Sequence, residues 1–361
     1  MATLKDVAKL ACVDVSTVSR ALNNTSYVHP DTKARILAAV KELSYQPNVL
    51  AKGLRQGKRH TIGIVVPRLS MTVFAELIQG IDEEARYHGY SILVCTTEDD
   101  PDVERECLNR LRNGFVDGII IAGTGKCGRL IRDIHASGIS VVQIIRKQES
   151  HLSSVIANYK QSAYRAVKYL AGKGCKEIGL INGPMSLSTY YERYQGYKKA
   201  ISELGLKEIC PESTQQANTF EYGFQCAEFL LTNYFHLDAI ITSVDIQGIG
   251  ALRAVKEQAM LVPEDIRLIS LTGHSIGGML ETTMTSLEIP AHEMGKKAAL
   301  MAIEEIDAPS DQKPSPQHLV FEATLVERES SVDCKNDVKK WRTAFKYNLP
   351  FYYCHYATSV S

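Results

Sequence analysis

The chain has 361 residues, which is long enough for more than one domain, and its 45% apolar and 23% charged residues are typical of an ordinary soluble globular protein rather than a disordered or fibrous one. The formal net charge is zero, which taken alone argues against a nucleic-acid partner. The distribution reverses that inference, because residues 1–60 hold ten Lys and Arg against four Asp and Glu, a net charge of +6, and leave −6 to the remainder.

Residues 4–24 predict two short helices joined by a tight turn. Ala11-Cys12-Val13 interrupts the first helical pattern, and Asp14 can cap the second helix. The apolar residues expected to point inward are Val7, Ala8, Leu10, Val18, Ala21 and Leu22. This is a helix-turn-helix, in which the outward-facing Val15, Ser16 and Arg20 would meet base edges or phosphates of DNA. The alternative is a pair of short helices in any helical domain, and the basic charge of residues 1–60 favours DNA.

A third helix is predicted from Pro30, with an apolar stripe of Ile36, Leu37, Val40 and Leu43. It closes a small domain over residues 1–46. Residues 47–60 then form a short helix or a linker that is too short to be stable alone.

From Thr61 onward, short β-rich apolar runs alternate with helical periods, which predicts parallel sheets covered by helices on both faces. The pattern occurs twice. Residues 177–181 (EIGLI) resemble residues 61–65 (TIGIV) in sequence. Gln79-Gly80 is also separated from Gly89 by the same number of residues as Gln195-Gly196 is from Gly205. We therefore expect two α/β lobes with a ligand site between them, at the carboxyl ends of the strands.

The segments TLKDVAKLA, STVSRALNN, YQPNVLAKGLR and TIGIVVP make the chain resemble the LacI/GalR family of bacterial transcription regulators, up to about Glu329. The resemblance implies an α/β fold with a three-helix head and a two-lobed core of the periplasmic-binding-protein type in residues 61–332. The chain would cross between lobes near Asn158, at Leu287 to Pro290 and at Pro314 to Gln317. Lobe 1 is then about 61–158 and 289–316, and lobe 2 about 159–288 and 317–332. Residues 333–361 form an atypical tail without heptads.

The resemblance also implies how DNA is bound. Residues 47–60 would be a hinge helix that folds when two subunits meet on DNA, with Leu54 wedged into the minor groove and Ala51 at the helix pairing. A flexible linker is the alternative in the absence of a partner subunit. The expected partners are a pseudo-palindromic DNA duplex and a second copy of the chain. The candidate DNA contacts are Thr3, Val15, Ser16, Thr17, Ser19, Arg20, Asn23, Asn48, Ala51, Leu54 and Arg55.

Cys12 departs from the family, which usually has glycine in this turn. A residue with a side chain held there at positive φ costs about 1 to 2 kcal/mol, so the head is expected to be less stable than that of its relatives. A reactive-cysteine switch is the other interpretation of Cys12.

For the effector, the resemblance implies that Arg193, in a segment preceding a helix, and Asp245, at the start of one, hold the polar groups of a small molecule, commonly a sugar. Phe74 and Phe220 either line the cleft or belong to the core. Arg68, Met71, Thr72, Val244, Thr272 and Gly273 replace residues that are common in relatives. Fewer polar contacts remain for a polyol, and Arg68 would suit an anionic effector.

Two other classes of function stay open. Gly273-His274-Ser275-Ile276-Gly277 follows a predicted strand and resembles a nucleophile elbow, so an esterase could use Ser275 with Asp307 and His318. A ligand-binding sensor without DNA function is the second alternative. Gly123-Thr124-Gly125-Lys126-Cys127-Gly128 matches G-x-G-x-x-G but falls in the third strand-helix unit, which favours a plain tight turn over a nucleotide site.

The chain shows no N-terminal apolar run that predicts export, and no stretch approaches the roughly 18 apolar residues of a membrane span. Nine cysteines without a C-x-x-C pair indicate neither a disulfide framework nor a zinc site. We therefore expect a cytoplasmic, non-enzymatic regulator, a repressor controlled by a carbohydrate effector, with neither metal nor cofactor.

Overall fold

The structure is a computed structural model that describes residues 2–23, 26–45, 58–213, 217–273, 275–309 and 311–332. The chain divides into two compact units, residues 1–60 and residues 61–361. Among the helices described, none is long and apolar enough to cross a membrane.

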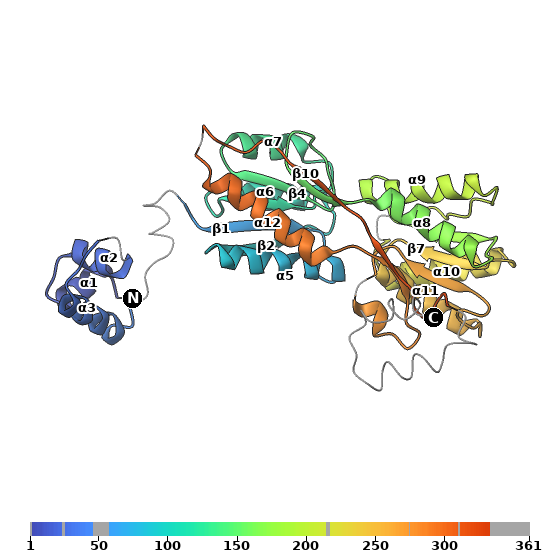
Figure 1. Ribbon diagram of the computed structural model, residues 1–361, viewed down its shortest axis with the longest axis horizontal. Coiled ribbons are helices and arrows are strands. Elements are labelled where there is room, and N and C mark those ends of the chain that lie inside the picture. The colour runs from blue at the N-terminus through green and yellow to red at the C-terminus, as the bar shows by residue number, and fades with distance from the viewer. Residues whose placement is uncertain are drawn as a thin grey trace, which may run out of the picture. The chain divides into compact units, whose positions relative to one another are not determined.

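The first unit contains the helices α1 (Leu4–Leu10), α2 (Val15–Asn23) and α3 (Pro30–Glu42), which confirms the helix-turn-helix and the third helix beginning at Pro30 (Figure 1). Val7, Val18 and Ile36 are fully buried at its centre. Two inward assignments were wrong, since Leu10 is 43% exposed and Leu37 is 50% exposed. The buried positions belong instead to alanines one or two residues away, Ala11 and Ala39, which let the three helices approach closely.

The turn between α1 and α2 passes through Cys12 at a φ of +52°, as its position in the motif predicted. The backbone amide of Cys12 donates to the carbonyl of Lys9 (3.3 Å), and that of Val13 to the carbonyl of Ala8 (3.0 Å). The tight turn therefore satisfies the last carbonyls of α1 while holding a side chain in the left-handed region.

In the second unit, lobe 1 is a six-stranded parallel sheet in the order β10-β5-β4-β3-β1-β2. Its helices α5 and α12 cover one face, and α6 and α7 cover the other (Figure 1). The strands are β1 (Thr61–Val66), β2 (Ser91–Thr96), β3 (Gly118–Ile121), β4 (Ser140–Ile144), β5 (Ser154–Ala157) and β10 (His318–Phe321). The helices are α5 (Thr72–Tyr87), α6 (Pro101–Arg112), α7 (Gly128–Ala136) and α12 (Ala291–Asp307).

Lobe 2 is a five-stranded sheet in the order β11-β9-β8-β7-β6, parallel except for the pair β11 and β9. Helices α8 and α9 pack together on one face, and α10 and α11 on the other. The strands are β6 (Ile178–Ile181), β7 (Ala239–Thr242), β8 (Arg267–Ser270), β9 (Thr285–Glu288) and β11 (Thr324–Val326). The helices are α8 (Tyr159–Gly172), α9 (Ser188–Glu203), α10 (Phe220–Asn233), α11 (Asp245–Glu257) and the short 3-10 helix η1 (Ser275–Gly278). This confirms the two α/β lobes.

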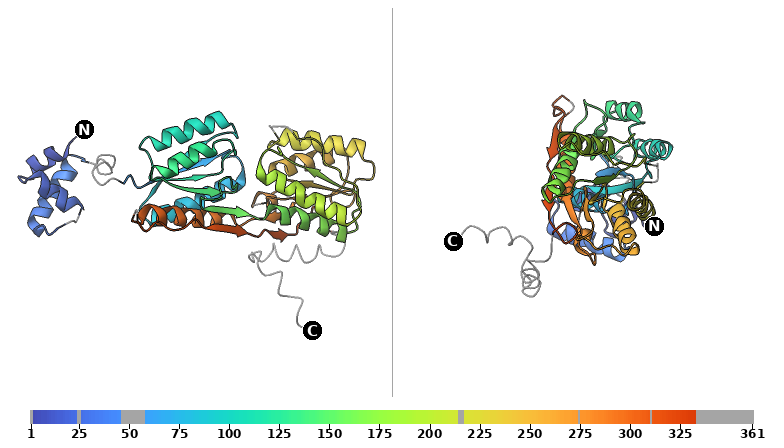
Figure 2. Two further views of the ribbon diagram at one scale, coloured as in Figure 1. Left: turned by 90° about the horizontal axis from the view of Figure 1, so that it is seen from above. Right: turned by 90° about the vertical axis from the view of Figure 1, so that its right-hand side faces the viewer.

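The chain crosses between lobes at three neighbouring places. The first crossing follows β5 at Asn158, whose amide nitrogen donates to the carbonyl of Phe321 (2.9 Å) and whose side chain donates to Glu322 (2.8 Å). The second lies between β9 and α12. The third lies between β10 and β11, later than the predicted Pro314 to Gln317, because residues 318–321 pair with β5 in lobe 1. The left view of Figure 2 shows α12 (orange), β10 and β11 (red) along one side of both lobes.

The repeat seen in the sequence has a structural counterpart in α5 and α9, which are both 16 residues long. A Cβ on Gly80 would lie 2.0 Å from the carbonyl oxygen of His292 in α12, and a Cβ on Gly196 would lie 1.9 Å from that of Lys160 in α8. Gly89 and Gly205 then follow the C-terminal caps of α5 and α9, with φ of +76° and +66°. The shared spacing thus preserves one close helix contact and one left-handed turn in each lobe.

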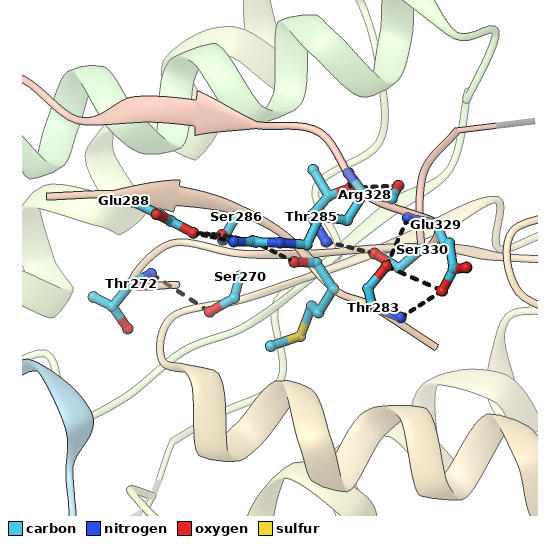
Figure 3. Close-up of polar contacts among 10 residues, drawn as sticks. Ser270, Thr272, Thr283, Thr285, Ser286, Glu288, Arg328, Glu329 and Ser330 are labelled. Atoms are coloured by element: carbon cyan, nitrogen blue, oxygen red, sulfur yellow. Dashed lines mark hydrogen bonds and ion pairs between the residues drawn. The ribbon is translucent and has the colours of Figure 1, made fainter. Parts of the chain in front are cut away.

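The last described residues anchor the third crossing to lobe 2 (Figure 3). The guanidinium of Arg328 donates to Ser286 Oγ (2.7 Å) and to Glu288 Oε1 (2.7 Å), both on β9. Ser330 Oγ donates to the carbonyl of Leu268 (2.6 Å) and accepts from the amide of Thr285 (2.8 Å). The buried hydroxyl groups of this part of the lobe are thereby satisfied by the crossing chain.

Candidate functional site

The exposed face of α2 carries the residues expected to meet DNA. Val15 is 38% exposed, and Ser16 and Arg20 are also exposed, whereas Val18 on the opposite face is fully buried. Thr17 and Ser19 are half-buried at the edge of this face. The helix therefore presents a short polar surface that its apolar side holds on the domain core.

Thr3 occupies the cap of α1. Its hydroxyl accepts from the amide of Asp6 (3.4 Å), and its own amide donates to Asp6 Oδ2 (2.7 Å), which together form a capping box; the hydroxyl also donates to Asp6 Oδ2 (2.7 Å). These hydrogen bonds from Thr3 lower the pKa of the Asp6 carboxyl. Thr3 is exposed, so a structural cap and a surface position coincide in one residue.

Five other candidate DNA contacts receive no structural test. Asn48, Ala51, Leu54 and Arg55 lie outside the described residues, as does the side chain of Asn23. The tail of residues 333–361 lies outside them as well.

In lobe 2, Arg193 lies within the second turn of α9 rather than before a helix. Its guanidinium is stacked between two rings, 4.8 Å from the centroid of Tyr159 and 5.4 Å from that of Tyr190. Arg193 is 3% exposed, and within the described part of the chain its guanidinium has neither a hydrogen bond nor an ion pair. Burial lowers the pKa of Arg193, although the neighbouring tyrosines and Glu192 oppose that effect.

Tyr190 is positioned by polar contacts on both sides. Its hydroxyl donates to Asn218, its carbonyl accepts from the side chain of Asn182 (3.1 Å), and its ring lies over Gly183, where a Cβ would be 2.6 Å away. Glycine at position 183 is therefore required for the ring to lie beside Arg193.

Asp245 is the first residue of α11, directly after β7, and it is 5% exposed. The turn before it is held by Gln247, whose side-chain oxygen accepts from the amides of Ser243 (3.1 Å) and Val244 (3.3 Å). Ser243 also donates to Asn182 (2.6 Å), which follows β6. Asn182, at the end of β6, thus links the turn before Asp245 to α9, the helix that carries Arg193, through its bonds to Ser243 and to the carbonyl of Tyr190.

In lobe 1, an ion pair stands at the corresponding edge of the sheet. Arg146, 5% exposed, donates to Asp99 Oδ1 (2.5 Å) and to the carbonyl of Gly123 (3.3 Å). Asp99 and Ile145 adopt φ of +60° and +66°, which is strained backbone of the kind found at functional sites. Arg68 forms its own ion pair with Glu98 (2.7 Å), so the added positive charge expected from Arg68 is neutralised.

Charged groups of lobe 1 act electrostatically on the aromatic and basic groups of lobe 2 and of the first crossing. The charges of Arg146 and Asp99 act on Tyr190, and the charge of Arg146 acts on both Tyr159 and Arg193. We call Asp99, Arg146, Tyr159, Tyr190 and Arg193 the interlobe cluster. It combines a paired guanidinium, an unpaired guanidinium and aromatic faces, which suits recognition of a small polar molecule with an acceptor group.

Sequence reasoning missed Arg146, Tyr159 and Tyr190. Arg146 follows β4 and Tyr159 follows β5, so the rule that ligands bind at the carboxyl ends of parallel strands could have found both. Phe74 is 2% exposed within the core of lobe 1. Phe220 is half-buried at the start of α10 and stacks on Phe224 with ring centroids 6.4 Å apart.

The residues of the esterase hypothesis are not brought together. Ser275 begins η1 in lobe 2, whereas Asp307 and His318 belong to lobe 1. Asp307 accepts from the hydroxyl of Tyr90 (3.0 Å), and His318 Nδ1 lies 2.9 Å from Ser154 Oγ.

The residues that match G-x-G-x-x-G form the turn between β3 and α7. The amide of Thr124 in this turn donates to the carboxyl group of Glu104. The turn is therefore built around an acidic side chain of the protein, which disfavours a phosphate at the same position. Among the described residues, no group of three His, Cys, Asp or Glu could hold a metal ion.

Comparison with known proteins agrees with this architecture. A family model described as "Periplasmic binding proteins and sugar binding domain of LacI family" matches residues 59–328, and one described as "Bacterial regulatory proteins, lacI family" matches residues 3–48. The ribose operon repressor of Halalkalibacterium halodurans is 29% identical over 307 residues, which cover 85% of this chain and 91% of that protein. The transcriptional regulator RegA of Clostridium saccharobutylicum is 30% identical over 336 residues, which cover 92% of this chain and 100% of that protein.

Solved structures support the same conclusion. The transcriptional regulator CelR in complex with cellobiose superposes with a TM-score of 0.68 at 25% identity, over 92% of this chain and 100% of that one. The Lac repressor bound to ONPG superposes with a TM-score of 0.80 over 91% of this chain and 99% of that one, a likeness of fold at 23% identity. The family models together span both the three-helix head and the two-lobed core. The chain belongs to the LacI family of bacterial regulatory proteins.

Proposed function

We propose that this protein is a homodimeric, sequence-specific DNA-binding repressor whose affinity for its operator is controlled by a small molecule bound between the lobes. The observation that carries the proposal is the exposed polar face of α2, held by a buried apolar face, in a chain that belongs to the LacI family. The segregation of charge supports it, since residues 1–60 carry +6 and the remainder −6.

In this function, Val15, Ser16 and Arg20 read the major groove, and Thr3, Thr17, Ser19 and Asn23 surround that contact. Asn48, Ala51, Leu54 and Arg55 belong to a hinge that inserts at the centre of a pseudo-palindromic operator. Two heads are needed because such an operator has two half-sites. A DNA partner supports a cytoplasmic location, and the regulators to which the chain is similar support binding rather than catalysis as its function.

The effector is proposed to be a sugar or a sugar derivative. A relative is named a ribose operon repressor, and a structural neighbour is a complex with cellobiose. Arg193 and Asp245 would hold the effector from lobe 2, with Tyr159 and Tyr190 beside Arg193. Arg68, Phe74 and Phe220 are secondary candidates, because Arg68 is ion-paired and Phe74 is part of the core. Such coupling between effector and operator is typically about 1 to 3 kcal/mol.

The test separates the two sites. DNA duplexes that bind the full-length protein are selected from a random library, and fluorescence anisotropy then measures the affinity of the protein for the selected duplex. Arg20→Ala should weaken effector-free DNA binding at least about tenfold, since charged contacts to DNA are lost. Arg193→Ala should leave that affinity unchanged.

A matched control is Arg253→Ala, which removes an exposed arginine of α11 whose ion-pair partner among the described residues is Glu257 on its own helix (2.7 Å). Arg253→Ala should change neither DNA binding nor effector binding. Equal losses of effector-free DNA binding in Arg20→Ala and Arg193→Ala would contradict the proposed division between the head and the core.

A further inference from the structure

Two free cysteines of lobe 1 lie where β2 meets its covering helix α6. Cys95 is on β2 beside Val65 of β1, and both pack in the apolar cluster that contains Leu108 of α6. Cys107, on α6, donates from its Sγ to the carbonyl of Thr96, the last residue of β2 (3.9 Å). The strand and the helix therefore bring the two thiols to the same place.

The thiols of Cys95 and Cys107 are in direct contact. Burial raises the pKa of Cys95, as do the charge of Cys107 and a hydrogen bond between the two thiols, and the charge of Arg110 has the opposite effect. Thiols in hydrogen-bond contact need only a short further approach to form an S–S bond.

Other cysteines of the described residues have contacts of a different kind. Cys12, Cys127 and Cys210 donate to backbone carbonyl groups, at 3.8, 3.5 and 3.8 Å. Cys226 is hydrogen-bonded to Tyr222. Each of these four thiols has an oxygen atom as its partner, whereas the thiol of Cys95 has a second thiol.

The two thiols of the pair differ in access. Cys95 is half-buried on an edge strand, whereas Cys107 is 8% exposed. An oxidant therefore reaches Cys95 first, and Cys107 is placed as the resolving thiol. The positive charge of Arg110 acts on Cys95 and favours the thiolate, which is the reactive form. Because burial opposes that effect, the pair is expected to respond to a sustained supply of oxidant rather than to traces of it.

We propose that Cys95 and Cys107 form an oxidation site, at which a hydroperoxide converts the two thiols into a disulfide that links β2 to α6. The thiolate of Cys95 attacks the terminal peroxide oxygen, so that an S–O bond forms, the O–O bond breaks and the peroxide leaves as an alcohol or water. The sulfur of Cys107 then attacks the resulting sulfenic acid, so that the S–S bond forms and the S–O bond breaks with release of water. The two sulfur atoms are oxidised, the peroxide is reduced, and the two thiol protons end on the released alcohol and water.

The site lies next to the strained turn that carries Asp99. The disulfide would close a short loop of the chain that contains Glu98 and Asp99, whose φ are +52° and +60°. Asp99 pairs with Arg146 (2.5 Å) in the interlobe cluster. Oxidation is therefore expected to restrict the segment that positions Asp99 and to raise the melting temperature of the protein, because a disulfide constrains the unfolded chain.

The experiment maps the thiols of the full-length protein. The protein is reduced, freed of reductant and treated with hydrogen peroxide, and the remaining thiols are alkylated with iodoacetamide. Trypsin cleaves after Arg105, between the two cysteines, so that they fall in separate peptides, residues 87–105 and 106–110. Mass spectrometry of the unreduced digest should show these peptides joined and two hydrogen atoms lighter than their sum, and dithiothreitol should release them.

Two variants assign the reaction to the pair. Cys107→Ser removes the resolving thiol, so peroxide should leave a sulfenic acid on Cys95 that dimedone traps on peptide 87–105, an adduct that stays minor in the wild type. Cys226→Ser is the matched control, because Cys226 is also half-buried but is bonded to Tyr222. It should form the disulfide as the wild type does. Peroxide should raise the melting temperature of the wild type and of Cys226→Ser, but not that of Cys107→Ser.

Circular dichroism confirms that each variant is folded, and Cys107→Ala takes the place of Cys107→Ser if the serine disturbs the fold. The inference is overturned if both thiols are still alkylated after peroxide has oxidised other cysteines, or if Cys95 is joined to a cysteine other than Cys107. It is also overturned if the wild type accumulates as much dimedone adduct on Cys95 as Cys107→Ser does. None of these measurements involves DNA or an effector, so their outcome is independent of the proposed function.

Discussion

Glu104 is a fully buried carboxyl group at the start of α6. The amide of Thr124 donates to its Oε2 (2.6 Å), but its Oε1 has no hydrogen-bond partner within the described residues. Burial raises the pKa of Glu104 above its ordinary value of 4.5, against the opposing effects of Thr124, Cys127 and Arg146. The folded protein thus holds a proton on Glu104 at a pH where the unfolded chain has released it.

The sign of the pH dependence follows. Because the pKa of Glu104 is raised in the folded state, its contribution to stability is greatest below pH 4.5 and is lost as pH rises through the folded pKa. Glu104→Gln replaces the carboxyl with a neutral group that can still accept from Thr124. The variant should therefore be more stable than the wild type at pH 7.5, and the difference should shrink toward pH 4.5, as measured by urea unfolding across this range.

Glu83 provides a control of opposite sign. His292 and Lys296 lower the pKa of this exposed carboxyl through hydrogen bonds. Glu83→Gln should therefore show no gain in stability at pH 7.5. If Glu104→Gln were less stable than the wild type at pH 7.5 and equal to it at low pH, Glu104 would be charged and favourably paired, contrary to the structure.

At the level of helices and strands, periodicity in the sequence was sufficient to predict the alternation of β and α segments and the internal repeat, because both lobes bury one face of each helix. The sequence pattern misplaced the third crossing because β10 gives a weak strand signal. β10 is an edge strand that follows a proline-containing segment, and its side chains alternate between exposed and half-buried. The sequence pattern also missed the interlobe cluster. Arg146 and Tyr190 belong to different lobes, and no local sequence pattern indicates that the charge of Arg146 acts on Tyr190.

The packing of α5 and α12 on one face of the lobe 1 sheet depends on a close approach of the two helices. A Cβ added at Gly80 would lie 2.0 Å from the backbone oxygen of His292, and one added at Gly295 would lie 2.2 Å from that of Leu77. Gly80→Ala should destabilise the protein by about 1 to 3 kcal/mol, since the helices must separate against a packed core. Urea unfolding of the full chain measures the change in free energy.

Gly172→Ala is the matched control, because Gly172 is also helical and a Cβ there would meet nothing within 4 Å. It should leave stability unchanged or raise it by about 0.5 to 1 kcal/mol through helix propensity. If the two variants behaved alike, the close approach of α5 and α12 would not be a determinant of stability.

For the molecule as a whole, charge is divided between parts with different partners. The net charge of zero arises from +6 in residues 1–60 and −6 in the remainder. The acidic core should reduce nonspecific adhesion to DNA, while the basic head attracts phosphate groups at close range. In a dimer, two heads act on one duplex, so the dependence of affinity on salt should reflect contacts of both.

For each phosphate that the protein contacts, the logarithm of the association constant falls by about 0.9 when the salt concentration rises tenfold, because binding releases cations from the DNA. The affinity of the wild type for its selected duplex should therefore fall steeply between 50 and 200 mM salt, by about 10³ or more if six or more phosphates are contacted. Arg20→Gln should lower the slope by about 2 per dimer if Arg20 contacts phosphate. If Arg20 reads a base, the slope should hardly change and the preferred sequence should relax at one position in each half-site. An affinity independent of salt in both proteins would contradict a basic head that binds duplex DNA.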